Sequence, residues 1–179
     1  MLEAVKIQTE ELQHRQRRIS ASLKIPHSPE SVWQVLSDYE NLPNFIPNLA
    51  SSKRLARPEG GIRLEQIGTQ KLLRINFSAR VVLDMEESFP HEIRFKMVEG
   101  DFKEFSGHWQ LNPISAGSPD NEYQSSTGTQ LLYSVLVWPK RTMPVRLIEN
   151  RICKDLRINL LAIRAQVIHT FGHPTEELA

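Results

Sequence analysis

The chain has 179 residues, which is the length of a single domain. Hydrophobic residues make up 40% of it, so the chain can build a core with room for a pocket, and a disordered or fibrous chain is excluded. The 22 Lys and Arg residues are balanced by 21 Asp and Glu residues, and the net charge of +1 argues against nucleic acid as a partner. The single cysteine, Cys153, excludes an internal disulfide and a Cys-rich metal site.

The first residues do not have the basic lead and apolar stretch of a secretory signal, because Glu3, Glu10 and Glu11 interrupt them. No run approaches the ~18 apolar residues that a membrane span requires. We therefore expect a cytoplasmic protein, and we leave peripheral contact with a membrane open. We expect residues 1–17 to form a tail or a short helix, residues 18–170 to form the domain, and residues 171–179 to form a second tail.

The predicted elements begin with a strand, because apolar and polar residues alternate from Arg18 to Ile25. Ser28, Pro29 and Glu30 then indicate a helix start: a serine caps free N–H groups, a proline suits the first helical position, and an acid suits the positive end of the helix dipole. Residues 39–47 contain two prolines and predict a second, short helix. Six strand candidates follow, at Ser51–Ala56, Ile62–Gly68, Leu72–Glu86, Glu92–Glu99, Phe102–Leu111 and Gln130–Pro139.

Two further segments complete the chain. Residues 112–129 are rich in Ser, Gly, Pro and Asn and predict a flexible loop inside the domain. Pro144 then opens a helix of about 25 residues that runs to His169 and is ended by Gly172 and Pro174. One apolar stripe follows this helix, made by Ile148, Ile152, Leu156, Leu160, Ile163 and Val167.

This order of elements predicts the α+β class with an antiparallel sheet, since the strands and the long helix are segregated along the chain. The sheet has one apolar face and the last helix has one apolar stripe, so we expect each to bury the other. Where a curved sheet and a straight helix diverge, a lined cavity can form between them.

Two motifs carry a resemblance to a known family. Ile25–Pro43 reads IPHSPESVWQVLSDYENLP and resembles the opening of polyketide cyclase/dehydrase and START-like lipid-transfer proteins, whose superfamily includes coenzyme Q-binding proteins and pathogenesis-related plant allergens. Val137–Pro139, followed by Pro144 and Asp155–Leu160, is similar to the C-terminal signature of that superfamily. The resemblance covers about residues 18–168. It implies the helix-grip fold: a curved antiparallel sheet of about seven strands around the long C-terminal helix, two short helices after the first strand, and a deep apolar cavity.

The leading functional hypothesis is therefore binding or transport of an apolar small molecule, such as a lipid, quinone, isoprenoid or polyketide-like compound, between the sheet and the last helix. Ligand sites are mainly apolar with a few polar groups, and Tyr133 is the best polar candidate because a buried phenol requires a partner. Phe45 and Ile46 are predicted to form part of a lid. The predicted ligand-binding residues are Phe45, Ile46, Phe77, Ala79, Val81, Phe95, Phe105, Trp109, Tyr133, Ile148, Ile152 and Leu156.

Two alternatives stay open. A polyketide cyclase, aromatase or dehydrase would need a polar group in the pocket to move protons, and the candidates are Tyr133, Arg80, Glu65 and His108. A protein-interaction module would need a free surface instead. No cofactor and no metal site are predicted, since Gly172 breaks the helix between His169 and His173 and no phosphate-binding loop occurs.

The charge pattern near the last helix adds one expectation about partners. Seven basic and two acidic residues lie between Trp138 and Ile168. We expect contact with an anionic membrane or an acidic partner, since clustered basic residues bind such surfaces. The residues predicted for this contact are Lys140, Arg141, Arg146, Arg151, Lys154 and Arg157. The apolar outer face of the last strand, at Leu132, Leu136 and Trp138, is expected to meet either a second subunit in a homodimer or the N-terminal segment, and both alternatives are left open.

Overall fold

The computed structural model describes residues 4–72, 75–115 and 126–173, with the side chains of residues 70–77 and 126 outside that description. The elements follow the chain in this order: β1 (Lys6–Glu11), η1 (Gln13–Arg15), β2 (Arg17–Ile25), α1 (Pro29–Leu36), η2 (Leu42–Asn44), β3 (Leu49–Leu55), β4 (Ile62–Leu72), β5 (Ile75–Ser88), β6 (Glu92–Gly100), β7 (Glu104–Ser115), β8 (Ser126–Trp138) and α2 (Val145–Phe171).

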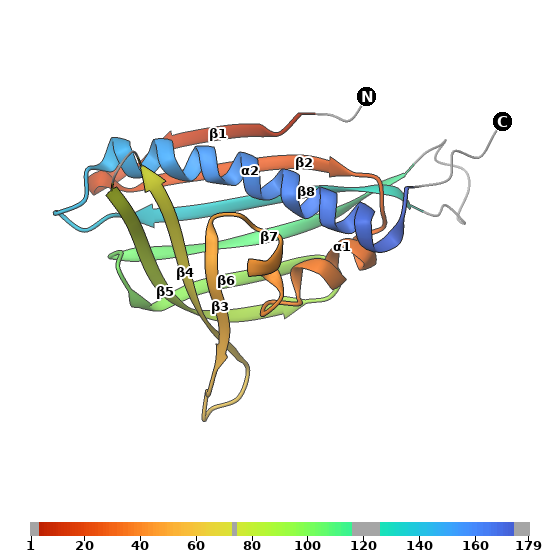
Figure 1. The fold of residues 1–179 in the computed structure, drawn as a ribbon, viewed down its shortest axis with the longest axis horizontal. Helices are drawn as coiled ribbons and strands as arrows, with labels where there is room; N and C mark the ends of the chain where they lie inside the picture. The colour runs from red at the N-terminus through yellow and green to blue at the C-terminus, as the bar shows by residue number, and fades with distance from the viewer. Residues whose placement is uncertain (1–3, 73–74, 116–125, 174–179) are drawn as a thin grey trace.

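The strands form one antiparallel sheet in the order β1-β2-β8-β7-β6-β5-β4-β3. Figure 1 shows this sheet curving around α2, with the first turns of the helix in light blue and its last turns, in dark blue, beside α1. The α+β class and the helix-grip arrangement are confirmed. The described sheet has eight strands rather than about seven, because the segment before β2 adds an edge strand.

That edge strand corrects one prediction. Residues 1–17 were expected to be a tail or a short helix, but β1 pairs antiparallel with β2 from Lys6↔Ser22 to Glu11↔Arg17. Five of its six residues are exposed, so β1 has no apolar alternation. Backbone pairing at a sheet edge holds this strand, and hydrophobic patterning cannot detect it.

The predicted loop 112–129 is also corrected. Residues 112–115 extend β7, residues 126–129 belong to β8, and the two strands pair from Glu104↔Trp138 to Ser115↔Ser126. The remainder of the predicted loop lies outside the described residues. The predicted strand Leu72–Glu86 has a different start, because Leu72 ends β4 and β5 runs from Ile75 to Ser88.

The predicted start of α1 is confirmed by its cap. The Ser31 backbone N–H donates to Ser28 Oγ over 3.4 Å, and Pro29 takes the first turn. The helix then buries Val32, Trp33, Val35 and Leu36 against the core.

The last helix packs unevenly on the sheet. α2 contacts the sheet mainly at β2, and it also contacts α1. Leu160 and Val167 have no exposed surface, so the helix is closely packed at these positions. The helix therefore packs most closely on β2 and α1, while the rest of the sheet curves around its other side (Figure 1).

Candidate functional site

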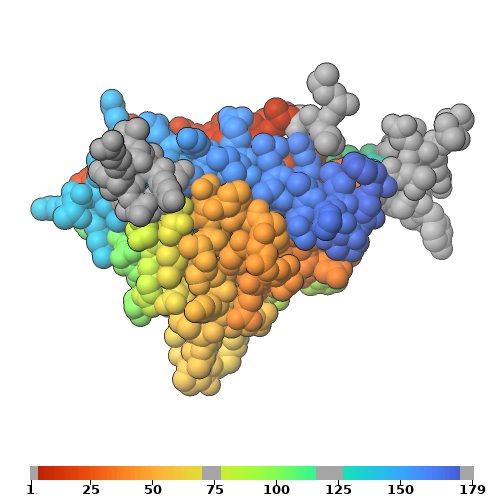
Figure 2. All heavy atoms as spheres, in the orientation of Figure 1, coloured from red at the N-terminus to blue at the C-terminus, as the bar shows by residue number. Residues whose placement is uncertain are grey.

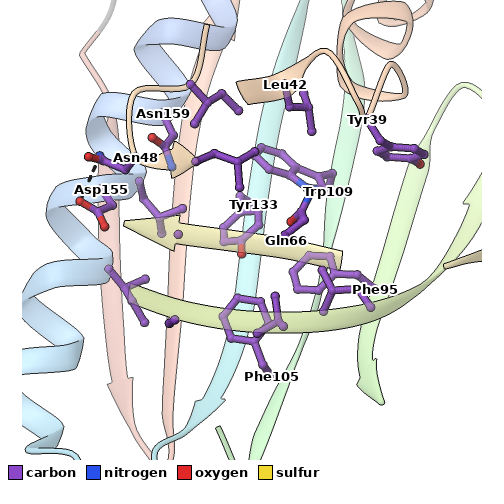
Figure 3. A pocket seen from close by; sticks show the side chains of 18 of the residues that line it. Tyr39, Leu42, Asn48, Gln66, Phe95, Phe105, Trp109, Tyr133, Asp155 and Asn159 are labelled. Carbon is purple, nitrogen blue, oxygen red and sulfur yellow. Dashed lines mark hydrogen bonds between the residues drawn. The ribbon is translucent and has the colours of Figure 1, made fainter. Parts of the chain in front are cut away.

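A cavity of about 250 Å³ lies between α2 and the part of the sheet that curves away from it. Its lining comes from α1, the segment around η2, strands β3 to β8, and α2. No described residue of β1 or β2 takes part. The cavity thus occupies the side of the fold on which the helix and the sheet diverge, as Figure 3 shows from close by.

One wall of the cavity is aromatic and is formed by Phe95, Phe105, Trp109 and Tyr133, which we call the aromatic wall. The ring of Tyr133 stacks on Phe95 at 5.7 Å between centroids and lies 4.5 Å from Trp109. Phe95 is also 5.8 Å from Phe105. These separations are those of stabilising aromatic pairs.

Gly107 makes room for this wall. A Cβ at Gly107 would lie 2.0 Å from the Ser134 carbonyl oxygen and 2.9 Å from Cζ of Phe95. Only a residue without a side chain lets the Phe95 ring and the β8 backbone approach this closely.

Four polar residues line the cavity on or beside α2: Arg151, Asp155 and Asn159 of the helix, and Asn48, which precedes β3. We call these four residues the polar cluster. Figure 3 shows Asn48, Asp155 and Asn159 on the helix side. Asn48 Nδ2 donates to Asp155 Oδ1 over 3.1 Å, and Arg151 Nε lies 3.6 Å from Asp155 Oδ2. Burial raises the pKa of Asp155 above its ordinary value, although the charges of Arg151 and Lys154 act in the opposite direction. The carboxyl group is therefore held at the cavity by a helix and a loop that are far apart in sequence.

Asn159 is the one member of the polar cluster with an orphan atom. Its Oδ1 is shielded from solvent and accepts no hydrogen bond from any described residue. An unsatisfied buried acceptor costs about 1–3 kcal/mol.

Tyr133 presents the polar group of the aromatic wall. Its hydroxyl makes no hydrogen bond with the part of the chain that the structure describes, and burial alone raises its pKa. The phenol therefore stays protonated at neutral pH and can act only as a neutral hydrogen-bonding group. Tyr39, which also lines the cavity, has its hydroxyl engaged with Glu87 Oε1 at 2.6 Å.

Comparison with known proteins identifies the family. Residues 25–161 match the family described as polyketide cyclase/dehydrase and lipid transport. The chain belongs to this family. The matched range begins at the last residue of β2 and reaches into α2, so it contains nearly every element that lines the cavity.

The curated relatives are named as bacterial toxins rather than as cyclases or lipid carriers. The chain is 26% identical over 98 residues to the ribosome association toxin RatA of Escherichia coli K12, a match that covers 55% of this chain and 60% of the toxin. The persistence and stress-resistance toxin PasT of a second E. coli strain matches equally well. The chain therefore aligns with less than two thirds of the length of these curated relatives.

Solved structures share the fold at low identity. TTHA0849 of Thermus thermophilus has a TM-score of 0.69 at 19% identity, covering 86% of this chain and 99% of its own. A STAR-related lipid transfer protein of Xanthomonas axonopodis has a TM-score of 0.68 at 16% identity and covers 92% and 94%. The ZhuI aromatase/cyclase of a Streptomyces species has a TM-score of 0.64 at 13% identity and covers 85% and 93%.

Most of the predicted ligand-binding residues of this family member line the cavity. Phe45 packs against the core but is not part of the lining, whereas its neighbour Ile46 is. The side chain of Phe77 lies outside the described residues. The other predicted residues on the lining are Ala79, Val81, Phe95, Phe105, Trp109, Tyr133, Ile148, Ile152 and Leu156.

Three of the four predicted catalytic candidates lie away from the cavity lining. Arg80 pairs with Glu65 at 2.7 Å and with Glu99 at 2.6 Å. His108 alternates along β7 with the inward-facing Gly107 and Trp109, and it stands opposite Arg94 and Ser134 in the sheet. Because side chains alternate between the two faces of a strand, these residues belong to the outer face. Tyr133 alone of the four lines the cavity.

The polar cluster was missed by sequence reasoning. Arg151, Asp155 and Asn159 are spaced four residues apart, parallel to the apolar stripe, which places them on one side of the helix. That spacing was the available signal. The contribution of Asn48 could not be foreseen, because it depends on how the segment before β3 meets the helix.

The predicted basic surface is smaller in the structure. Arg151 lines the cavity and is removed from this surface. Arg157 stays exposed, although its Nη1 donates to the Val5 carbonyl oxygen. The other exposed residues of the set are Lys140, Arg141, Arg146 and Lys154. Figure 2 shows the light-blue segment around the start of α2 protruding at one end of the molecule. We call the five exposed residues Lys140, Arg141, Arg146, Lys154 and Arg157 the basic face.

Within the described ranges, no three His, Cys, Asp or Glu residues gather as metal ligands. No helix there is long and apolar enough to cross a membrane.

Proposed function

We propose that this chain binds and carries an apolar small molecule in the cavity between the sheet and α2. The observation that supports this proposal most strongly is a cavity of about 250 Å³ lined largely by aliphatic and aromatic side chains. That volume lies just below the range of roughly 300–1,000 Å³ that is typical of small-molecule sites. A compact ring compound or a short isoprenoid chain suits it better than a two-chain lipid.

The binding energy would come from two sources. Transfer of the ligand from water stabilises the complex by about 25 cal/mol for each Å² of apolar surface that is buried. The aromatic wall adds offset stacking, worth about 0.5–1.5 kcal/mol for each aromatic pair, if the ligand carries a ring. The lipid-transport description of the family is consistent with this role.

A variant whose larger side chain fills the cavity tests the proposal. Ile152 lines the cavity from α2, whereas Leu147 is 49% exposed on the same helix. The purified wild type, Ile152→Trp and Leu147→Trp are each incubated with a lipid and quinone extract, and bound compounds are identified by native mass spectrometry. The wild type and L147W are expected to retain a compound that I152W has lost. Equal retention by all three proteins, or no retention by the wild type, contradicts the proposal.

A second candidate is catalysis of proton transfer on a polyketide-like substrate. Asp155 favours it, because burial raises the pKa of this cavity carboxyl and so strengthens it as a base. In this reaction the Asp155 carboxylate takes a proton from the carbon beside a substrate carbonyl, leaving an enolate. Deuterium exchange into a 1,3-diketone, followed by NMR, would then be faster with the wild type than with Asp155→Asn. Glu149→Gln is the control, since Glu149 pairs with Arg17 and does not line the cavity. Equal exchange rates for wild type and D155N exclude this candidate.

A third candidate is a protein-interaction module. It is favoured by the match to a protein named for ribosome association and by the basic face. Co-sedimentation with purified ribosomes tests it, with Arg146→Glu as the variant and Lys53→Glu, on β3, as the control. A wild type that stays at the top of the gradient excludes a ribosome-binding role.

A further inference from the structure

The aromatic wall contains a buried hydroxyl group that has no partner. The Tyr133 side chain is only 8% exposed, and its hydroxyl makes no hydrogen bond with the described residues. Unlike Asn159 Oδ1, this oxygen is not sealed off by its neighbours, so an occupant of the cavity can reach it. In Figure 3 the hydroxyl lies amid the side chains that line the cavity.

A second buried tyrosine on the lining shows the contrast. Tyr39 is 3% exposed, and its hydroxyl donates to Glu87 Oε1 over 2.6 Å. Gln66, which is less buried, also has a partner on the protein, since its Nε2 donates to Ser52 Oγ over 3.2 Å. Buried polar groups without a partner are exceptions in native structures, and each is a cost to the fold. Tyr133 is therefore a group that an occupant of the cavity would satisfy.

The composition of the aromatic wall decides whether the ligand group should accept or donate. Phe95 and Phe105 have no polar side-chain atom, and Trp109 has an indole N–H, which can only donate. That N–H also has no partner in the described part of the chain, and the rings of Trp109 and Tyr133 are 4.5 Å apart. A phenol donates a hydrogen bond more readily than it accepts one, because its ring withdraws electron density from the oxygen. The wall therefore favours an acceptor on the ligand.

The surroundings of the hydroxyl favour a neutral acceptor over an anion. The Tyr133 ring stacks on Phe95 at 5.7 Å between centroids, and Phe105 lies 5.8 Å from Phe95. Transfer of a carboxylate from water to such apolar surroundings costs far more than transfer of an uncharged polar group. Arg151, a cation on the lining, already lies beside Asp155, with 3.6 Å between Nε and Oδ2. A carbonyl group provides a strong acceptor without a charge.

We infer that the cavity selects an apolar ligand with a neutral carbonyl group, whose oxygen accepts a hydrogen bond from the Tyr133 hydroxyl while the apolar body lies against the aromatic wall. This inference rests on the proposed function, because it concerns the occupant of the same cavity. Tyr133 is then the residue that determines specificity for the polar group of the ligand.

Three probes with one ring system test the inference: 2-acetylnaphthalene, 2-isopropenylnaphthalene and 2-naphthoate. The first two have the same shape, and they differ by a carbonyl oxygen in place of a CH₂ group. The third is an anion at pH 7. Binding to the full chain is measured by calorimetry. We expect 2-naphthoate to bind more weakly than 2-acetylnaphthalene, because its charge must be desolvated.

A matched pair of variants locates the donor. Tyr133→Phe removes the hydroxyl and keeps the ring, while Tyr39→Phe makes the same change at the lining tyrosine whose hydroxyl already donates to Glu87. With Y133F, the ratio of the affinity for 2-acetylnaphthalene to that for 2-isopropenylnaphthalene should fall about tenfold, the factor that one net hydrogen bond supplies. With Y39F this ratio should stay as in the wild type. Retained binding of 2-isopropenylnaphthalene by Y133F shows that this variant is folded.

Infrared difference spectroscopy of bound 2-acetylnaphthalene, isotope-labelled at its carbonyl carbon, gives a second readout. A hydrogen bond to the carbonyl oxygen lowers the stretching frequency of the C=O bond. In the wild-type complex, the carbonyl band should therefore lie below its position for the same ketone in hexane. In the Y133F complex, the band should return to the hexane position.

The outcomes separate the inference from the proposed function. If the carbonyl band of the wild-type complex lies at the hexane position, or if 2-naphthoate binds more tightly than 2-acetylnaphthalene, the inference is overturned while the cavity remains a ligand site. If Y133F keeps the wild-type affinity ratio, or Y39F lowers it as much, the Tyr133 hydroxyl is not the donor and the inference is overturned as well. If neither neutral probe binds the wild type, the proposed function itself fails for compact ring compounds, and the inference fails with it. The infrared measurement on the wild type needs no variant, so it holds even if Y133F does not fold.

Discussion

The first half of α2 borders the cavity, whereas the second half is mostly packed against other elements and reaches the cavity at Asn159 and Ile163. Leu160 and Val167 have no exposed surface and do not line the cavity. Ile148, Ile152 and Leu156 continue the same apolar stripe toward the start of the helix, but they line empty space. The helix packs on β2 and α1. The cavity separates it from strands β3 to β7. Some positions of one apolar stripe thus belong to the packed core, and others line the cavity.

Similar apolar side chains occupy packed positions and lining positions of α2, so the composition of the helix alone does not create the site. A void beside well-packed apolar residues lowers stability, since lining atoms lose contacts that a solid core would provide. The closely packed positions supply the stability that lets other positions border a cavity.

The largest expected change in stability comes from truncating a closely packed side chain of α2. Leu160→Ala should lower the free energy of unfolding by about 4 kcal/mol, because it removes buried methyl groups and leaves a closed void. Leu156→Ala should lower it by only about 2 kcal/mol, because its void merges with a cavity that already exists. Urea denaturation followed by circular dichroism measures both.

The control for this pair is Leu161→Ala, since Leu161 is 39% exposed and its loss should change stability by less than about 0.5 kcal/mol. Equal losses for L160A and L156A would mean that the two halves of the helix are packed alike, contrary to the comparison.

The next effect concerns the aromatic wall. Gly107→Ala should lower the free energy of unfolding by at least about 2 kcal/mol, because its Cβ would lie 2.0 Å from the Ser134 oxygen and must displace β8 or Phe95. Thermal and urea unfolding measure the loss. Gly68→Ala is the matched control, because it also lines the cavity but its nearest contact would be an ordinary 3.6 Å. A G107A variant as stable as G68A would show that the wall tolerates a side chain at this position.

The contrast between the halves of α2 also explains what the sequence could predict. Ile148 to Val167 form one stripe in the sequence, and the resulting helix, its partner sheet and the cap at Ser28 are as predicted. Periodicity identifies the buried face of a helix. It cannot say which turns of that face meet a partner, since this depends on strand curvature and helix tilt.

The locations of polar side chains were harder to predict, because periodicity does not show which partner a polar residue meets in the fold. Arg151 was assigned to a charged outer surface because basic residues recur through this region, yet it pairs with Asp155 at the cavity. Arg80 and Glu65 were proposed for chemistry and instead pair on the outer face of the sheet. An ion pair across neighbouring strands leaves no periodic signal that distinguishes it from a pair of catalytic groups.

The smallest expected effect concerns the basic face, which gathers near the cavity half of α2. If this half meets anionic membranes when the ligand is exchanged, vesicles with anionic lipids should bind the chain and neutral vesicles should not. Arg141→Ala and Arg146→Ala should each weaken vesicle binding by about 1 kcal/mol, or roughly fivefold. Lys53→Ala, on the edge strand β3, is the control with the same change of charge. Because exposed charges are screened, binding should vanish near 1 M salt, where the Debye length is about 3 Å. If binding persists at that salt concentration, the basic face does not hold the chain on the membrane, and the exposed Leu147 is the remaining contact. If K53A weakens binding as much as R146A does, the basic face has no special role in membrane contact.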